Sequence, residues 1–161
     1  MKRRAACLTL LTLAGCGFAL RQPQDVPFER LAFIGFAPRA PMEAALRQAL
    51  PTSVHVTAAP AQAQIVLRVL EDRVTRTMVA STAAAQVREL RLRLMLRLQL
   101  EAPDGRIRLP ATLLEQTRDL SYTETRALAK ETEEAQLLTA MRADLARQVV
   151  HMLATLDADQ D

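Results

Sequence analysis

The residue of this chain with the clearest chemical use is Cys16, a thiol that directly follows two small residues, Ala14 and Gly15. Residues 2–4 are Lys, Arg and Arg, and a short apolar run follows over residues 5–14. A basic start, an apolar run of about ten residues and a small-residue cleavage point are typical of a secretory signal. A cysteine at that point can take a diacylglycerol group on its sulfur and then become the new N-terminus. The segment therefore predicts a bacterial lipoprotein signal with lipid attachment at Cys16.

Two other interpretations of this segment are an ordinary secretory signal and a membrane-spanning anchor. The apolar run is too short for a span, which needs about 20 residues, and an ordinary signal needs no cysteine after its small residues. Residue 17 is glycine, whereas aspartate at this position is the usual inner-membrane retention signal in many bacteria. We therefore expect an outer-membrane protein anchored in the inner leaflet and facing the periplasm.

Removal of residues 1–15 changes what composition implies about partners. The chain has 21 Lys and Arg against 18 Asp and Glu, and three of the basic residues leave with the signal, so the remainder has no net charge. A neutral domain gives no electrostatic argument for binding nucleic acid. Cys7 lies in the signal and Cys16 is acylated, so no thiol remains for zinc or redox chemistry, and we expect no metal and no cofactor. The predicted organisation is a signal peptide (1–15), a lipidated tether (16–30), one domain (31–156) and an acidic tail (157–161).

The most regular pattern in the chain is an alternation over residues 90–101. Leucine occupies every even position from 90 to 100, and Arg91, Arg93 and Arg97 stand between these leucines. Leucine favours helices, but a helix would scatter these leucines around its whole circumference. The period of two therefore predicts a long strand with one buried face and one face in water.

Two helices and several further strands are predicted around this strand. Apolar residues spaced three and four apart predict a short helix over residues 41–50, with proline in its first turn, and a long helix over about 124–156. Ser121 and Glu124 form a candidate capping box for the long helix. The other strands are expected at residues 31–36, 54–57, 65–77, 107–109 and 113–120, with turns at 80–85 and 103–105. The predicted fold class is α+β, with the two helices packed on one face of a roughly four-stranded, mostly antiparallel sheet.

Several of these segments together resemble the LPS-assembly lipoprotein family, LptE, the small subunit of the outer-membrane lipopolysaccharide translocon. Residues 16–21 resemble the start of that family, which is a lipidated cysteine followed by glycine, an aromatic residue and Leu-Arg. Residues 127–131 resemble its Ala-Leu-Ala-Lys segment, and the order of the elements is similar. Residues that match the spacing of the family's acidic helix are Glu134, Met141, Asp144 and Gln148.

The resemblance implies a protein without catalytic activity that sits as a plug inside a large β-barrel. Such a protein helps the barrel to assemble and binds lipopolysaccharide on its way to the outer leaflet. The family has a lysine associated with lipopolysaccharide at the position of Lys130. It also has an arginine near the turn between its two long strands, but residues 80–85 contain none, and Arg76 and Arg88 flank this turn without aligning.

Lys130 also has an interpretation that needs no ligand. It lies early in the predicted long helix, where it could be a solvated side chain or could pair with Glu134 four residues later. A role in binding lipopolysaccharide fits its charge and its apolar neighbours, because lipopolysaccharide offers phosphates and acyl chains together.

Arginines on the wet face of the long strand form the second candidate site. Arg91, Arg93 and Arg97, with Arg118 on a neighbouring strand, could meet lipopolysaccharide phosphates or acidic residues of a barrel wall. The alternative is a solubilising face that protects the sheet edge and forms cross-strand ion pairs. Candidate partners for such pairs are Glu89, Glu101 and Glu115.

Catalysis has no candidate residues in this sequence. His55 and His151 are the only histidines, and neither has metal-ligand spacing or a nearby nucleophile. A second function remains open, that of an auxiliary lipoprotein of a phospholipid-transporting ABC system, which can share a lipidated α/β layout. The partner separates the two functions, because the first requires an outer-membrane barrel and the second an inner-membrane transporter.

Overall fold

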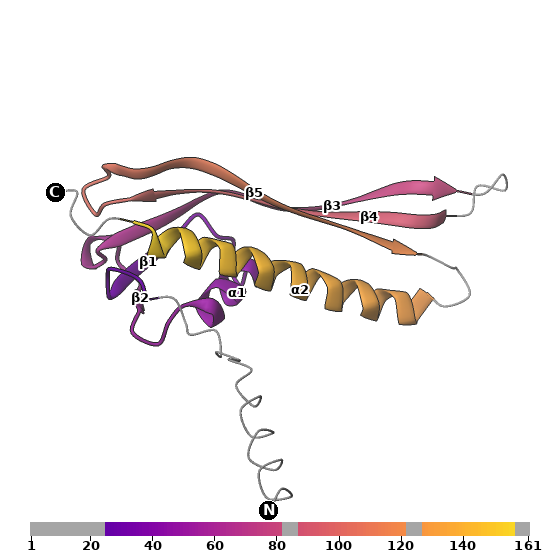
Figure 1. The fold of residues 1–161 in the computed structure, drawn as a ribbon, viewed down its shortest axis with the longest axis horizontal. Coiled ribbons are helices and arrows are strands. Elements are labelled where there is room, and N and C mark those ends of the chain that lie inside the picture. The colour runs from indigo at the N-terminus through magenta and orange to yellow at the C-terminus, as the bar shows by residue number, and fades with distance from the viewer. Residues whose placement is uncertain (1–24, 82–86, 122–126, 157–161) are drawn as a thin grey trace, which may run out of the picture.

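The protein folds as one mixed sheet with two helices on one of its faces (Figure 1). The computed structural model describes residues 25–81, 87–121 and 127–156. The predicted α+β class is confirmed, although the sheet has five strands rather than about four. In chain order the elements are β1 (Arg30–Ile34), α1 (Pro41–Ala49), β2 (His55–Thr57), the 3₁₀ turn η1 (Pro60–Gln62), β3 (Ile65–Ser81), β4 (Val87–Glu101), β5 (Ile107–Ser121) and α2 (Ala127–Ala154).

The strand order, β2-β1-β3-β4-β5, joins two kinds of pairing. β3, β4 and β5 are consecutive in the chain and pair antiparallel over most of their length. β1 lies between β2 and β3 and is parallel to both. Parallel neighbours need a crossover connection, and α1 supplies it between β1 and β2. Figure 1 accordingly shows α1, β1 and β2 gathered at one end of the three long strands.

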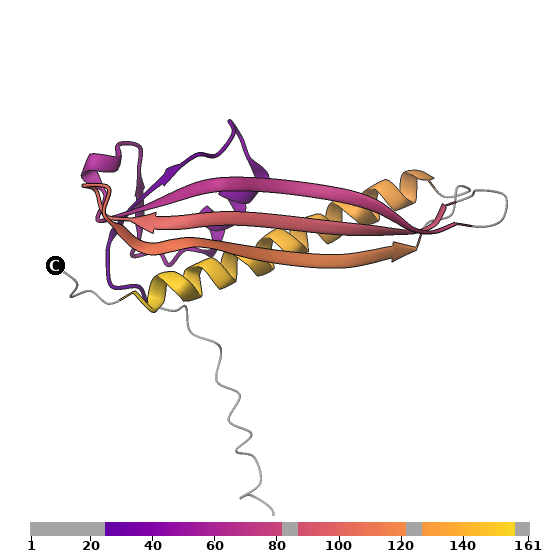
Figure 2. The ribbon, with the colours of Figure 1, turned by 90° about the horizontal axis from the view of Figure 1, so that it is seen from above.

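The leucines of β4 form the centre of the core, as the alternation predicted. Leu92, Leu94, Leu96, Leu98 and Leu100 have no exposed surface, and Leu90 at the far end is partly buried. Helix α2 runs the length of the long strands over this face (Figures 1 and 2). Full burial of a leucine side chain contributes about 1.5–3 kcal/mol, so this row is a main source of stability.

Both helices present the predicted apolar stripe to the sheet. In α1, Met42 and Leu46 are buried. In α2 the predicted stripe is buried at Leu138, Met141, Leu145 and Val149, and its last members, Met152 and Leu156, are partly buried beside the fully buried Leu153. The helix is described from Ala127, and the predicted start near residue 124 lies outside the described residues. Of the proposed capping box, Ser121 is the last residue of β5 and Glu124 lies outside the described residues.

A bulge in β3 lies against the end of β1. The pairing of β3 with β4 shifts between Val69 and Glu71, so that Leu70 is an extra residue in β3. Gly35 follows β1 with φ of +93°, and a Cβ atom on it would lie 2.2 Å from the carbonyl oxygen of Val69. Only glycine fits both this backbone conformation and this close approach.

Candidate functional site

The face of the sheet opposite α2, which we call the open face, carries three of the four arginines singled out from the sequence. Arg91, Arg93 and Arg97 are exposed and alternate with the buried leucines of β4. Residues directly opposite one another in an antiparallel pair share a face. On this basis β5 contributes Glu115, Thr117 and Asp119 to the open face, and β3 contributes Glu71 and Arg73.

Two of these arginines are held by carboxylates of β5. Arg91 donates from Nε and Nη2 to the two carboxylate oxygens of Asp119 at 2.7 and 2.9 Å, and Arg93 Nη2 donates to Glu115 Oε2 at 2.6 Å. These hydrogen bonds lower the pKa of Asp119 and of Glu115 below their ordinary values. Both carboxylates are therefore ionised at neutral pH. The expected cross-strand pairs are present, and Glu115 was among the partners named from the sequence.

Arg97 differs from the other two. Among the described residues it has no ion pair, although Glu71 lies opposite it on β3. Its neighbour across the strand on the other side is Leu113, which is exposed. Met95, two residues before it on the same face, is buried. The middle of the open face thus combines an unpaired cation with apolar surface.

Arg118 does not lie with the other three arginines. It is opposite Leu92 in the pairing of β5 with β4, which places it on the face that α2 covers. There its Nη2 lies 3.7 Å from Asp144 Oδ2 of α2. Its Nη1 donates to the backbone carbonyl of Thr117 at 2.9 Å.

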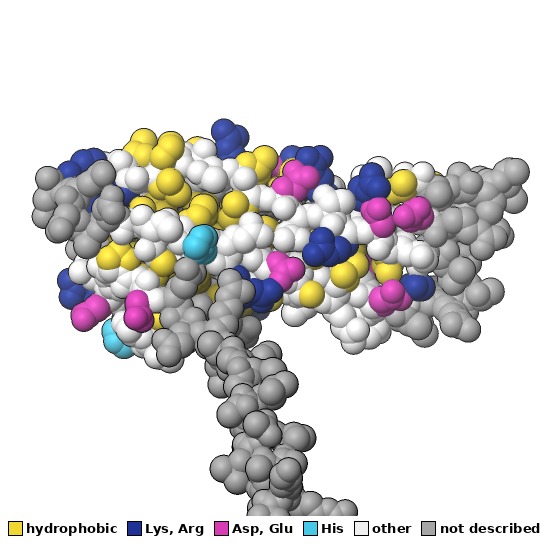
Figure 3. Space-filling view, viewed as in Figure 1, with side chains coloured by type: hydrophobic (Ala, Val, Ile, Leu, Met, Phe, Trp, Pro, Cys, Tyr) yellow, Lys and Arg dark blue, Asp and Glu magenta, His cyan; other side chains and the backbone are white. Residues whose placement is uncertain are grey.

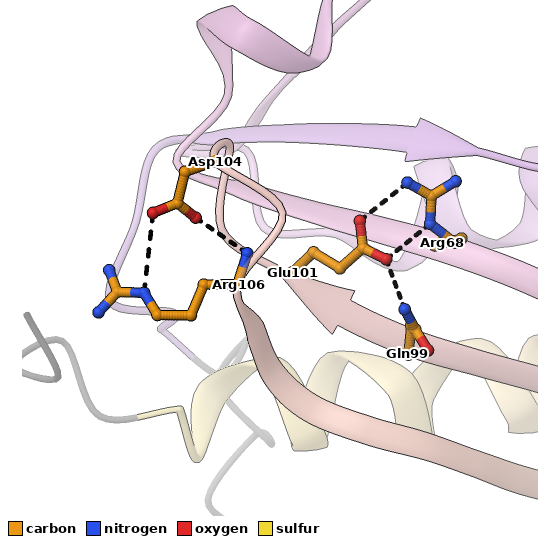
Figure 4. Close-up of polar contacts among 5 residues, drawn as sticks. All are labelled: Arg68, Gln99, Glu101, Asp104 and Arg106. Carbon is orange, nitrogen blue, oxygen red and sulfur yellow. Dashed lines mark hydrogen bonds and ion pairs between the residues drawn. The ribbon is translucent and has the colours of Figure 1, made fainter.

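A buried carboxylate, Glu101, ends the open face beside the β4–β5 turn (Figure 4). It is 6% exposed and accepts from Arg68 Nε at 2.6 Å and from Arg68 Nη2 at 2.9 Å. Gln99 Nε2 also donates to it at 2.5 Å. The hydrogen bond from Arg68 is the main cause of a lowered pKa for Glu101. The sequence named Glu101 as a partner for arginine but gave no sign of its burial.

Lys130 lies in the first turns of α2 and is paired within the helix. Its Nζ donates to Glu133 Oε2 at 2.7 Å. The side chain of Lys130 is 18% exposed, whereas that of Glu133 is 53% exposed. The sequence analysis offered Glu134 as an ion-pair partner for Lys130. The lysine is paired, but with Glu133. Apart from Lys2, Lys130 is the only lysine of the chain, which has 19 arginines.

Glu134 instead joins α2 to the sheet. It accepts from Arg76 Nε of β3 at 2.5 Å. Here the exposures are reversed, because Arg76 is 59% exposed and Glu134 is 17% exposed. The sequence named Arg76 only as a residue that flanks the turn, and nothing local indicates that it reaches a helix 58 residues away.

Two grooves beside α2 contain none of these open-face residues and do not include Lys130. One, of about 520 Å³, lies between α1 and α2, and the other, of about 500 Å³, lies between β5 and α2 and includes His151. In the described ranges no group of three or more His, Cys, Asp or Glu side chains is placed to hold a metal ion. None of the described helices combines the length and the apolar character of a membrane span.

Two features from the sequence lie wholly or partly outside the described residues. Cys16 precedes residue 25, where the description begins. Of the turn predicted at residues 80–85, Ala80 and Ser81 belong to β3, and residues 82–86 are not described.

The fold and the site define a class of small two-layer α+β proteins, with one sheet face under helices and one polar face open. Three solved structures share this fold. Uncharacterized lipoprotein B from Nitrosomonas europaea has a TM-score of 0.72 at 20% identity and covers 86% of this chain and 90% of its own. A minor lipoprotein from Acinetobacter baumannii has a TM-score of 0.66 at 22% identity, and the match covers 81% of this chain and 93% of the lipoprotein. Rare lipoprotein B from Shewanella oneidensis has a TM-score of 0.63 at 20% identity, and the match covers 79% of this chain and 95% of that protein.

A protein-family model gives the more specific result. The model LptE, described as lipopolysaccharide-assembly, matches residues 28–153. The chain therefore belongs to the LptE family of lipopolysaccharide-assembly proteins, as the resemblance indicated. A search of curated proteins returned no match.

Proposed function

We propose that this protein is an outer-membrane lipoprotein, anchored by lipid on Cys16, that plugs a β-barrel translocon. In this role it helps the barrel to assemble and binds lipopolysaccharide during insertion into the outer leaflet. The observation that carries the proposal is the family match over residues 28–153, which spans every strand and nearly all of α2.

The open face supports the part of the proposal that concerns the barrel. A plug must present a polar surface to the wall around it, and this face is an array of charged groups whose members mostly neutralise one another. Figure 3 shows a similar mixture of acidic and basic side chains along one side of the molecule. Paired charges favour a partner of matching polar pattern over a strongly acidic one, because the face has little excess positive charge to attract anions.

Lys130 supports the part that concerns lipopolysaccharide. Its ammonium group can donate to a phosphate oxygen as a compact point charge. A cation in the first turns of a helix opposes the helix dipole, while an anion bound there is favoured by it. The placement therefore costs some stability in the free protein and suits an anionic ligand.

Recovery of partners from outer membranes tests the proposal. The full chain carries a C-terminal tag, the membranes are extracted in mild detergent, and stoichiometric partners are identified by mass spectrometry. We expect one large β-barrel at about one copy per copy of this protein. Recovery of inner-membrane transporter subunits, or of no partner, would overturn the barrel proposal.

Lipopolysaccharide binding is tested on the same preparation with two alanine variants. Lys130→Ala should weaken binding of lipopolysaccharide, whereas Arg30→Ala, which removes an exposed cation of β1, should not. Equal binding by the two variants would remove Lys130 from the proposed site. A second control measures acylation, because Cys16→Ala should abolish incorporation of labelled palmitate.

A further inference from the structure

The two ion pairs near the start of α2 differ in which partner is accessible to water. In the pair of Lys130 with Glu133 the cation is 18% exposed and the carboxylate 53%. In the pair of Arg76 with Glu134 the carboxylate is 17% exposed and the cation 59%. The accessible and replaceable member is thus Glu133 in the first pair, whereas Glu134 is enclosed and held by another element.

We infer that Glu133 is an internal competitor for the ligand of Lys130, and that it makes the site selective for phosphate monoesters over phosphodiesters. This inference rests on the proposed function, because it takes Lys130 as a ligand contact. The carboxylate of Glu133 lies 2.7 Å from the ammonium group and occupies part of the exposed surface of a side chain that is only 18% exposed, so a ligand must compete with it. Its anion must therefore bind Lys130 more strongly than a carboxylate does.

The Lys130–Glu133 pair is weak enough to be displaced. Water screens it, since more than half of the Glu133 side chain is exposed. Its order along the helix is also the less favourable one, with the cation nearer the N-terminus and the acid after it. After displacement Glu133 extends into water and loses little solvation.

The charge of the ligand decides whether displacement occurs. A phosphodiester and a carboxylate each carry one negative charge, so exchange between them gains little. A phosphate monoester carries about −1.5 to −2 near pH 7 and offers three acceptor oxygens. It therefore replaces Glu133 on Lys130 with a net gain. The carboxylate of Glu134 stays in place during the exchange, because Arg76 of β3 neutralises it and holds it at 2.5 Å.

The chain offers a matched control for this competition. Glu131 is an exposed acid in the same turn of α2, and among the described residues it has no ion pair. Glu131→Gln and Glu133→Gln change the net charge equally, but only the second frees Lys130. A difference between these variants therefore measures the contact and not the charge of the helix.

Vesicles that differ only in headgroup test the inference on the full chain. The vesicles are phosphatidylcholine with either phosphatidic acid, a monoester, or the same mole fraction of phosphatidylglycerol, a diester, with identical acyl chains. We expect the unaltered protein to prefer phosphatidic acid. Glu133→Gln should bind phosphatidylglycerol about threefold more tightly and so narrow the preference, while Glu131→Gln should leave the preference unchanged.

Each other outcome overturns the inference in a recognisable way. If Lys130→Ala weakens lipopolysaccharide binding but Glu133→Gln behaves as Glu131→Gln does, the proposed function stands and the competition is rejected. If the unaltered protein does not discriminate between the two vesicles, the selectivity is rejected. If Lys130→Ala binds lipopolysaccharide and phosphatidic acid as the unaltered protein does, the proposed site and the inference fall together.

Discussion

The two faces of β4 use the same strand for different purposes. On one face, five leucines are removed from water entirely beneath α2. On the other, Arg91 and Arg93 reach across to carboxylates of β5 and remain in contact with water. Burial of leucine contributes several times more than an exposed ion pair, because water screens the pair. The buried leucines of β4 therefore stabilise the fold, whereas the arginines at the alternate positions are available to a partner.

The largest effect should come from the leucine face. Leu96→Ala should lower the free energy of unfolding by about 2–5 kcal/mol, since it leaves a cavity where no surface was exposed. Urea unfolding followed by circular dichroism measures this. Leu113→Ala is the matched control, because that leucine is exposed on the open face and should change stability by less than about 0.5 kcal/mol. Similar losses from both variants would contradict the distinction between the faces.

Glu101 should give the next largest effect, because it is the buried carboxylate of the open face. Glu101→Gln removes charge-assisted hydrogen bonds from Arg68 and should cost about 1–3 kcal/mol at neutral pH. The pKa of Glu101 is lowered in the folded protein. Its contribution is therefore fully present above the ordinary glutamate pKa and is lost as pH falls through the lower folded value.

Unfolding measured from neutral pH into this acid range checks the sign. The difference between the unaltered protein and Glu101→Gln should shrink steadily as the pH falls. A difference that stayed constant with pH would show that the charge of Glu101 is not what stabilises this end of the sheet.

Arg76 should give a smaller and more local effect on the covered side. Arg76→Ala breaks the link between β3 and the start of α2, which should cost about 0.5–1 kcal/mol. Amide hydrogen exchange should accelerate over residues 130–137 and remain unchanged around the buried Leu145. Uniform acceleration along α2 would mean that the helix responds as one unit.

The exposed ion pairs of Arg91 and Arg93 on the open face should contribute least to stability and most to partner binding. Replacing Arg91 and Arg93 by Gln, which removes the charges without placing like charges against Asp119 and Glu115, should change the urea midpoint only slightly, yet reduce recovery of the barrel about tenfold because the face becomes acidic. The exchange Arg93→Glu with Glu115→Arg keeps the internal pair and reverses its direction. If both variants recovered the barrel fully, the open face would not contact the barrel and would serve only to keep the protein soluble.

Local patterns in the sequence were sufficient for the elements whose signals repeat. The leucine alternation predicted β4 and its buried face, and the three-and-four spacing predicted both helices. The position of β1 between β2 and β3 carries no such signal, because parallel pairing joins segments distant in the chain and depends on the crossover. For this reason the sequence predicted about four mostly antiparallel strands, and the fifth strand and the parallel pairing of β1 were not predicted.

The candidate site was predictable in its residue types and less so in its contacts. Cross-strand pairing follows from alternation, so Glu115 could be predicted as a partner for the arginines of β4, but its assignment to Arg93 and the pairing of Arg91 with Asp119 could not. The face of Arg118 depends on register, which shifts between Leu98 and Leu100 in the pairing of β4 with β5. The choice of Glu133 over Glu134 as partner of Lys130 depends on Arg76, which reaches Glu134 from another element.

The meander of β3, β4 and β5 has a consequence for how the chain folds. Its strands follow one another directly, so pairing can begin where they are closest in sequence, at Ser81 with Val87 and at Glu101 with Ile107, and then extend one pair at a time. Such contacts close short loops and form quickly, whereas the pairing of β1 with β3 closes a segment of some 30 residues and comes at a higher entropic cost. We expect the long hairpins to act as a template on which β1, guided by Gly35 against the bulge of β3, docks last.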